Sequence, residues 1–309
     1  MKTKNKRALQ MSFSWIFAIV VGIFILFLAL YGATKIINTG QQATSAQAGK
    51  EILILTDPLE TSFQEGRVSS LSLPVETRIN NTCNSPVNNE IFGFQGIIVY
   101  QKSFGKWTKT DIESSFENKY IFSEKISEGK NFILFSKPFE FPFKIADLIY
   151  LIPLNKNYCF VDSPERIKNE ISDLKPDNIF TEECPDNSIQ VCFKGGECDI
   201  NVNENPDFVE KRGEIVYYEG DALEYAAIFS DKDIYECQVQ RLIARAQELA
   251  FIYDEKQTSL LSQECSPEVN VLSLISALNS INSSKELIFV RDVVKNIKAE
   301  NNQAECRLW

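Results

Sequence analysis

Residues 13–33 form the longest apolar run of the chain, FSWIFAIVVGIFILFLALYGA, and no charged side chain lies between Arg7 and Lys35. At a rise of 1.5 Å per residue, a helix of this length covers about 30 Å, the thickness of the hydrocarbon core of a bilayer. Backbone groups in lipid must be hydrogen-bonded within the segment, and a helix achieves this. The pattern therefore predicts a transmembrane helix over residues 12–34.

The charges that flank this run give its orientation. Four basic residues and no acidic residue precede it, whereas the single Lys35 follows directly. The positive-inside rule then places residues 1–11 in the cytoplasm and the bulk of the chain outside. A cleaved secretory signal has a shorter apolar region and a cleavage site directly after it, but the nearest clean site here is Ala46-Gln47-Ala48. We therefore expect an uncleaved anchor in the plasma membrane.

The string KRALQMSFS, residues 6–14, leads directly into the apolar run. It resembles archaeal class III, prepilin-like signal peptides, in which a basic segment and a small residue precede Gln and, two places on, Ser. The resemblance covers about the first 35 residues and implies cleavage between Leu9 and Gln10, followed by bundling of the freed helix into a filament. Two positions depart from the family: Leu9 stands where it has Gly or Ala, and Ser14 where a pilin usually has Glu.

Small residues recur along the predicted helix at steps of four, seven and four: Ala18, Gly22, Ala29 and Ala33. At 100° per residue they share one stripe about 60° wide. Such a stripe lets a second helix approach closely, which predicts a homo- or hetero-oligomer formed through the membrane helix. The alternative is that Gly and Ala are common in membrane helices that have no partner.

Residues 35–59 are poor in charge and rich in Ala, Gln and Thr, which predicts a helical stalk. Residues 60–215 are rich in β-branched and aromatic positions separated by Gly, Asn and Pro, and predict a β-rich ectodomain. The candidate strands are residues 67–73, 76–81, 91–102, 120–127, 131–136, 157–161, 189–193, 199–202 and 214–218. The apolar run at residues 132–154 has two interpretations: buried strands followed by a short helix, or an exposed aromatic patch.

Helical signals interrupt and then replace the strand pattern. Ser163 and Pro164 predict a short helix that ends at Leu174. From residue 216 to 309 the apolar positions follow a helical period, with a long helix capped by Ser230 and two shorter ones at residues 268–278 and 285–298. The last of these is opened by Ser283 with Glu286 three residues on, as in a capping box. The fold class predicted for the whole chain is α+β, with an N-terminal transmembrane helix, a β-rich ectodomain and a helical C-terminal part.

The charge balance limits the class of partner. Four of the 32 basic residues precede the apolar run, so the remaining part carries 28 basic against 42 acidic residues, a net charge of −14. This balance argues against binding to nucleic acid or to anionic lipid headgroups. The negative charge is accounted for by the solubility that an exported domain needs, and it is also compatible with a cationic partner.

All eight cysteines lie on the side assigned to the exterior: Cys83, Cys159, Cys184, Cys192, Cys198, Cys237, Cys265 and Cys306. Their even number predicts up to four disulfides in an oxidising compartment, with a pairing that the sequence leaves open. The string at residues 192–198 is symmetric about Gly195, and a three-residue hairpin loop with Gly196 in the left-handed position would set Cys192 opposite Cys198, with Cys184 as a competitor. The chain has no histidine, which excludes Ser-His-Asp and Cys-His catalysis and histidine-ligated metals. We therefore expect no enzyme and no cofactor.

One string has the spacing of a cation site. Asp199, Asn201 and Asn203 place oxygen donors at alternate positions, and Glu210 follows at the twelfth place, as calcium ligands would. Glu204 stands where an EF-hand needs Gly, and the same alternation is typical of an ordinary strand. The sequence as a whole predicts a membrane-anchored cell-envelope protein with a structural or interaction role, which the resemblance would make a pilin-like subunit. The alternative is an anchored module that binds a ligand or cation.

Overall fold

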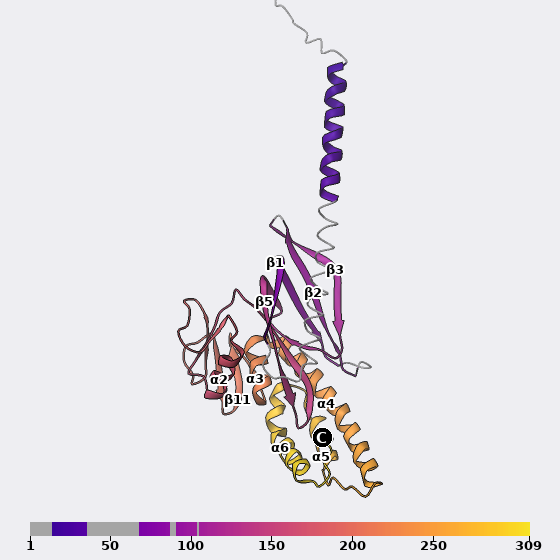
Figure 1. Ribbon diagram of the computed structural model, residues 1–309, viewed down its shortest axis with the longest axis vertical. Helices are drawn as coiled ribbons and strands as arrows, with labels where there is room; N and C mark the ends of the chain where they lie inside the picture. The colour runs from indigo at the N-terminus through magenta and orange to yellow at the C-terminus, as the bar shows by residue number, and fades with distance from the viewer. Residues whose placement is uncertain (1–13, 36–67, 87–90, 104) are drawn as a thin grey trace, which may run out of the picture.

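The computed structural model describes residues 14–35, 68–86, 91–103 and 105–309 of the chain (Figure 1). The predicted cytoplasmic tail, the Leu9–Gln10 processing position and the predicted stalk, apart from Lys35, lie outside these residues. The first described element is the helix Ser14–Lys35, whose 22 residues have a mean hydropathy of 2.8 and which is long and apolar enough to cross a membrane. The four small residues of the stripe lie exposed on it, and a side chain added at Gly22 would meet no atom within 4 Å.

The described residues that follow the apolar helix, which we call the head, contain two sheets. The strands of sheet A lie in the order β3-β2-β1-β5-β6-β4, and all neighbours are antiparallel except β4 and β6. Their bounds are Val68–Asn84 (β1), Phe94–Ser103 (β2), Lys106–Phe116 (β3), Tyr120–Phe122 (β4), Ile126–Glu140 (β5) and Lys144–Pro153 (β6). Five successive residues of β5, from Phe132 to Ser136, are buried, so this central strand is covered on both faces.

The strands of sheet B follow the order β12-β11-β10-β9-β7-β8. Their bounds are Tyr158–Val161 (β7), Ile179–Phe180 (β8), Ile189–Cys192 (β9), Ile200–Glu204 (β10), Asp207–Lys211 (β11) and Glu214–Tyr217 (β12). The strands from β8 to β10 are parallel, and β10, β11 and β12 form an antiparallel meander. Helix α2, Glu165–Leu174, connects the parallel neighbours β7 and β8.

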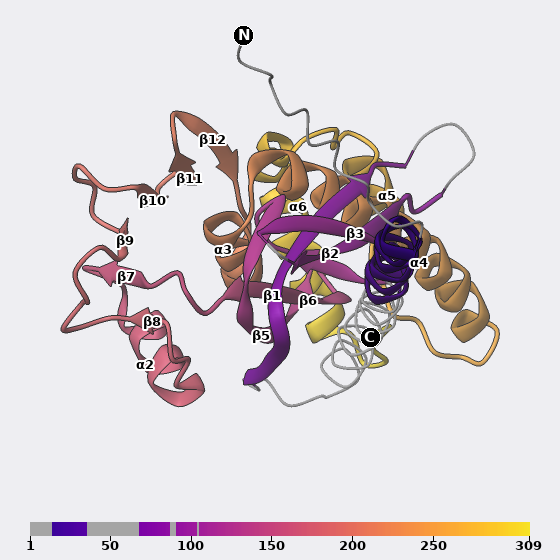
Figure 2. The ribbon, with the colours of Figure 1, turned by 90° about the horizontal axis from the view of Figure 1, so that it is seen from above.

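The C-terminal helices complete a core shared with both sheets. They are α3 (Gly220–Phe229), α4 (Lys232–Leu261), α5 (Val271–Leu278), the 3-10 turn η1 (Ser284–Glu286) and α6 (Leu287–Gln303). Helix α3 contacts β5 and β6 of sheet A and β11 of sheet B, and Figure 2 shows it between the two sheets. Every residue of α3 from Ala222 to Phe229 is buried, so the helix beyond its first two residues has no solvent face. A helix that is apolar on all sides packs only inside a core.

The α+β prediction is confirmed in its coarse form: an N-terminal apolar helix, a β-rich middle and C-terminal helices. The run at residues 132–154 is buried, in agreement with the first interpretation, but the predicted short helix is wrong because Lys144–Pro153 is strand β6. Residues 106–116 were not predicted as a strand, since β3 is an edge strand in which most residues are polar.

Two of the three predicted helix caps are wrong. Helix α2 begins after Pro164, and the buried Ser163 hydroxyl makes no hydrogen bond among the described residues. The N-cap residue of α4 is Asp231 and not Ser230. Its carboxylate makes no capping hydrogen bond but accepts one from the backbone N–H of Lys125 (2.8 Å), which ties the start of the helix to the β4–β5 turn. The predicted capping box of Ser283 and Glu286 is present.

The eight cysteines form four disulfides and none is free: Cys83–Cys237, Cys159–Cys184, Cys192–Cys198 and Cys265–Cys306. The bridge between Cys192 and Cys198 is therefore present, but the predicted hairpin is wrong because β9 and β10 are parallel. Gly195 and Gly196 adopt positive φ angles of 75° and 142°, which lets the short connection return the chain to the start of a parallel strand.

Candidate functional site: a charged cleft beside α2 and α3

A cleft with a volume of about 810 Å³ lies where the end of β5, helix α2 and the start of α3 meet. Charged side chains dominate its lining, and apolar atoms of Pro138, Phe139 and Leu174 form part of its wall. The charged residues are Lys137, Glu140, Arg166, Glu170, Asp173, Glu219 and Asp221. We call this feature the charged cleft.

The sequence of α2 explains why its charges gather in the cleft. Ile167, Ile171 and Leu174 are the buried positions of the helix, and they attach it to the core. Arg166, Glu170 and Asp173 recur at steps of four and three, so they share a neighbouring face of the same helix. Burial of the apolar face therefore fixes the direction in which the three charged side chains point.

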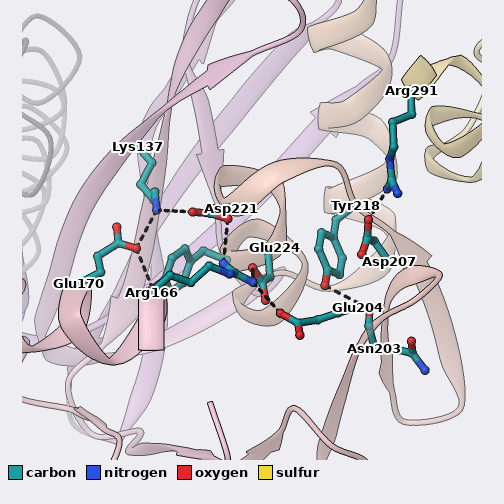
Figure 3. A network of polar contacts seen from close by, with 11 residues as sticks. Lys137, Arg166, Glu170, Asn203, Glu204, Asp207, Tyr218, Asp221, Glu224 and Arg291 are labelled. Atoms are coloured by element: carbon teal, nitrogen blue, oxygen red, sulfur yellow. Dashed lines mark hydrogen bonds and ion pairs between the residues drawn. The ribbon is translucent and has the colours of Figure 1, made fainter. Parts of the chain in front are cut away.

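Lys137 of β5 lies between carboxylates from two helices. Its Nζ atom is 2.7 Å from Glu170 Oε2 of α2 and 3.9 Å from Asp221 Oδ2 of α3 (Figure 3). The ammonium group also lies 4.9 Å from the centre of the Tyr225 ring, and the Tyr225 hydroxyl donates a hydrogen bond to Glu170 Oε2 (3.1 Å). Lys137 therefore has its charge balanced without any ligand.

Arg166 contacts three carboxylates. Its Nη1 atom is 2.8 Å from Asp221 Oδ1, and its Nη2 atom is 3.0 Å from Glu204 Oε1 and 2.7 Å from Glu224 Oε2 (Figure 3). These partners come from α3 and from β10 in sheet B. One guanidinium thus neutralises at most one of three carboxylates and holds three elements together.

Glu224 is the buried member of this group, with 1% of its side chain exposed. Its Oε1 atom has no hydrogen-bond partner among the described residues. Desolvation raises the pKa of Glu224 to about 7, although the ion pair with Arg166 favours the charged form. The network is therefore short of positive charge at its most buried point.

A second arginine extends the network to the last helix. Arg291 of α6 forms ion pairs with Asp207 of β11 and with Glu219, the residue before α3. Desolvation raises the pKa of Glu219, while Arg291 acts in the opposite direction. The charged cleft is thus lined by the end of β5, helix α2 and the start of α3, and ion pairs of its members reach β10 of sheet B and helix α6.

Three of the four predicted cation ligands lie on the β10–β11 hairpin, and Asp199 directly precedes β10; none of the four lines the charged cleft. Asn201 and Glu210 are paired across the two strands, and both line a hollow of about 340 Å³ together with Asp199. Asn203 is not among the residues that line it, since its Oδ1 atom accepts a hydrogen bond from the backbone of Asn205 (2.8 Å). Arg212 also lines the hollow, and its positive charge opposes a cation. The described residues contain no group of three or more acidic or thiol side chains that is arranged to hold a metal.

Another hollow, of about 820 Å³, lies beside β1 and β2, and its lining includes Glu76, Lys102 and Lys130. Glu76 and Lys102 pair with one another at 2.7 Å and are exposed, so the hollow has no buried polar group to define a ligand. The charged cleft is therefore the better candidate site. Comparison of the chain with protein-family models, curated proteins and solved structures finds no match, so the site is assigned from its own geometry.

The charged cleft was not predicted from the sequence. Its members lie far apart in the chain, and only the sheet order brings Lys137, Arg166, Glu204 and Asp221 together. One local signal was present: Glu224 is the single charged residue in the apolar string ALEYAAIF of α3. An isolated acid among buried residues requires a partner, and here that partner is Arg166.

Proposed function

We propose that this chain is a single-pass membrane-anchored protein of the cell envelope, with its N-terminus in the cytoplasm and its head outside in a structural or interaction role. The observation that carries the proposal is the apolar helix Ser14–Lys35, preceded by four basic residues and followed by a head whose eight cysteines are all paired. Disulfides persist in oxidising compartments, which supports an exterior head.

Thiol labelling of cells tests the orientation. Intact cells are treated with a reductant that does not cross membranes and then with a membrane-impermeant maleimide of high mass. We expect the head cysteines to be labelled in intact cells. A matched control is Thr3→Cys, whose thiol should react only after lysis. Head cysteines that react only in broken cells would contradict the orientation.

We also propose, on the resemblance at residues 6–14, that the helix takes part in a pilin-like assembly. Its support is the string KRALQMSFS, which contains Leu9 and Gln10, together with the small-residue stripe. N-terminal sequencing of protein isolated from membranes should give Gln10 as the first residue. An intact Met1 would refute the processing.

The stripe is tested by a pair of variants on opposite sides of the helix. Gly22→Leu should reduce cross-linking between chains in membranes, because a bulky side chain separates the packed helices. Val20→Leu, about 160° away from Gly22 around the helix, should leave cross-linking unchanged. Equal cross-linking of the two variants would show that the stripe is not an interface between helices.

A second candidate function is cation binding at the β10–β11 hairpin. Its support is that Asp199, Asn201 and Glu210 line one hollow, in which the buried Asn201 Oδ1 atom has no hydrogen-bond partner among the described residues. Calcium should raise the melting midpoint of the full chain in detergent, because a ligand that binds the folded state stabilises it. Glu210→Gln should abolish the rise, and a flat wild-type response would remove the candidate.

A further inference from the structure

The antiparallel meander of β10, β11 and β12 has one buried face and one outward face. Val202, Val209 and Val216, one from each strand, are buried in the core. Side chains alternate along a strand, so the residues before and after each valine point to the other side. Figure 2 shows the three strands at the periphery of the head, and these outward side chains are exposed or partly exposed. We call this side the meander face.

The strand register arranges the meander face in two rows of three side chains. The first row holds an amide and two aromatic rings: Asn203, Phe208 and Tyr217. The second row holds an amide, a carboxylate and an apolar chain: Asn201, Glu210 and Ile215. Residues two apart in a strand are separated by about 7 Å, and so are the rows. The face is therefore aromatic in one row and mainly polar in the next.

The polar row borders a hollow of about 340 Å³, which Asn201 and Glu210 line together with Asp199 and Arg212. No hydrogen bond or ion pair of Glu210 is recorded among the described residues. The buried Asn201 Oδ1 atom also has no hydrogen-bond partner there. Both groups accept hydrogen bonds, so both lack a donor, and a buried acceptor without a donor is costly. Hydroxyl groups of a ligand would supply the donors.

The aromatic row is a second observation, independent of the hollow. The rings of Phe208 and Tyr217 lie 6.1 Å apart between centroids, at an angle of 62°, and both side chains are only partly buried. An aromatic ring at the surface gains stability when C–H groups of a ligand cover it and remove apolar area from water. The meander face therefore suits a ligand that combines C–H surface with hydroxyl groups.

The charges around the hollow limit the ligand further. Asp199 and Glu210 would repel an anion, and Arg212 would repel a cation. A neutral hydroxyl group both donates and accepts hydrogen bonds, so it can pair with the carboxylates, the amide and the guanidinium alike. Sugar rings have this chemistry, with hydroxyl groups around the rim and C–H groups on the two flat faces.

We infer that the meander face binds a neutral β-linked chain of hexoses, with sugar rings against Phe208 and Tyr217 and hydroxyl groups held by Asn201 and Glu210. A β-linked chain of this kind is a flat ribbon, which matches a sheet face, and the two rows accommodate more than one ring. The inference rests on the interaction role proposed for the head. It does not depend on the orientation of the anchor, and it uses two of the side chains of the calcium candidate.

Calorimetric titration of the full chain tests the inference. The protein is held in nanodiscs of zwitterionic lipid, so that no sugar-headed detergent competes, and the buffer contains EDTA. The probes are three neutral β-linked trisaccharides: cellotriose, triacetylchitotriose and mannotriose. We expect one saturable site for at least one of them. Trigalacturonic acid, which is anionic, should give no saturable heat because its carboxylates would face Asp199 and Glu210.

Variants locate the binding. Tyr217→Ala should weaken binding about tenfold through loss of the ring contact, and Tyr217→Trp should retain it. Glu210→Gln should also weaken binding about tenfold, since it removes a charge-assisted hydrogen bond. Phe251→Ala is the matched control, because it removes a ring of α4 that is 46% exposed and lies outside the meander. The recorded hydrogen bonds of Tyr217 are made by its backbone, so Tyr217→Ala keeps them, and Glu210→Gln keeps the test valid if that variant does not fold.

Four outcomes would overturn the inference. They are the absence of saturable heat with all three trisaccharides at millimolar concentration, unchanged binding in Tyr217→Ala, an equal loss of affinity in Phe251→Ala, and binding that requires calcium.

The calcium candidate fails separately. Tyr217→Ala should leave any calcium-dependent rise of the melting midpoint unchanged, because the ring is not a calcium ligand. None of these results bears on the thiol-labelling test of topology, so failure of sugar binding and failure of the proposed orientation are distinguishable.

Discussion

Replacing Arg241 with Met should destabilise the head strongly. Arg241 lies on α4, and it is the largest of the fully buried side chains. Its guanidinium donates a hydrogen bond to the Gln238 amide oxygen (2.7 Å). It also donates to four backbone carbonyls, those of Phe92 (3.2 Å), Phe116 (3.1 Å), Glu117 (2.8 Å) and Lys119 (2.9 Å). The guanidinium also lies 4.8 Å from the centre of the Tyr120 ring.

The magnitude follows from the groups that the substitution leaves unpaired. The hydrogen bonds to Lys119, Phe116 and Gln238 are buried, and each acceptor that loses its donor costs about 1–3 kcal/mol. Methionine recovers the apolar contacts and avoids the cost of burying a charge, which offsets part of this loss. We expect a net decrease of about 3–5 kcal/mol in the free energy of unfolding. Burial lowers the pKa of Arg241 to about 10, so the side chain stays charged near pH 7 and the loss should not depend on pH there.

Thermal melting of the full chain in detergent measures the effect. A loss of this size should lower the midpoint by about 10 °C for a head of this length. Arg245→Met is the matched control, since Arg245 lies one turn further along α4 and makes no hydrogen bond or ion pair recorded among the described residues. If the free energies of unfolding of the two variants differed by less than about 1 kcal/mol, the assignment of Arg241 as a buried donor would be refuted.

Two further predictions concern Glu224 and the disulfides. The pKa of Glu224 is raised from 4.5 to about 7, so the carboxylate destabilises the folded state increasingly as the pH rises through that window, by up to about 3 kcal/mol. Glu224→Gln should therefore gain stability relative to wild type between pH 4.5 and 8, and parallel melting curves would contradict this. Replacing Cys83 and Cys237 by Ala opens a loop of 154 residues and should cost about 5 kcal/mol, against about 2 kcal/mol for Cys192 and Cys198, six residues apart. Urea denaturation would rank the two, and equal losses would refute the loop-length argument.

Local signals in the sequence predicted local structure. The capping box at Ser283 and Glu286 depends on four consecutive residues and is present. The apolar helix and most of the strands also follow from patterns of a few residues. Helix α3 was missed because it is buried on all sides, so its apolar residues show no helical period. Strand β3 was missed for the opposite reason, since it is an edge strand and most of its residues are polar.

The charged cleft required information that no local pattern contains. Arg166 reaches Glu204 and Asp221, which are 38 and 55 residues away in the chain. These contacts depend on the order of strands in sheet B and on the placement of α3 against both sheets. The predicted cation site, by contrast, rested on a local pattern alone. Regular spacing of Asp199, Asn201 and Asn203 follows from the strand alternation of β10, and it brought only some of these oxygens into one hollow.

The pairing of the cysteines has a consequence for biosynthesis. Three bonds join cysteines that are consecutive in the sequence, but Cys83 is joined to Cys237 across Cys159, Cys184, Cys192 and Cys198. If the chain is exported from its N-terminus, as proposed, Cys83 emerges first and meets four wrong thiols before the right one. Oxidation in order of emergence would give mispaired chains, so maturation requires either delayed oxidation or an isomerase in the receiving compartment.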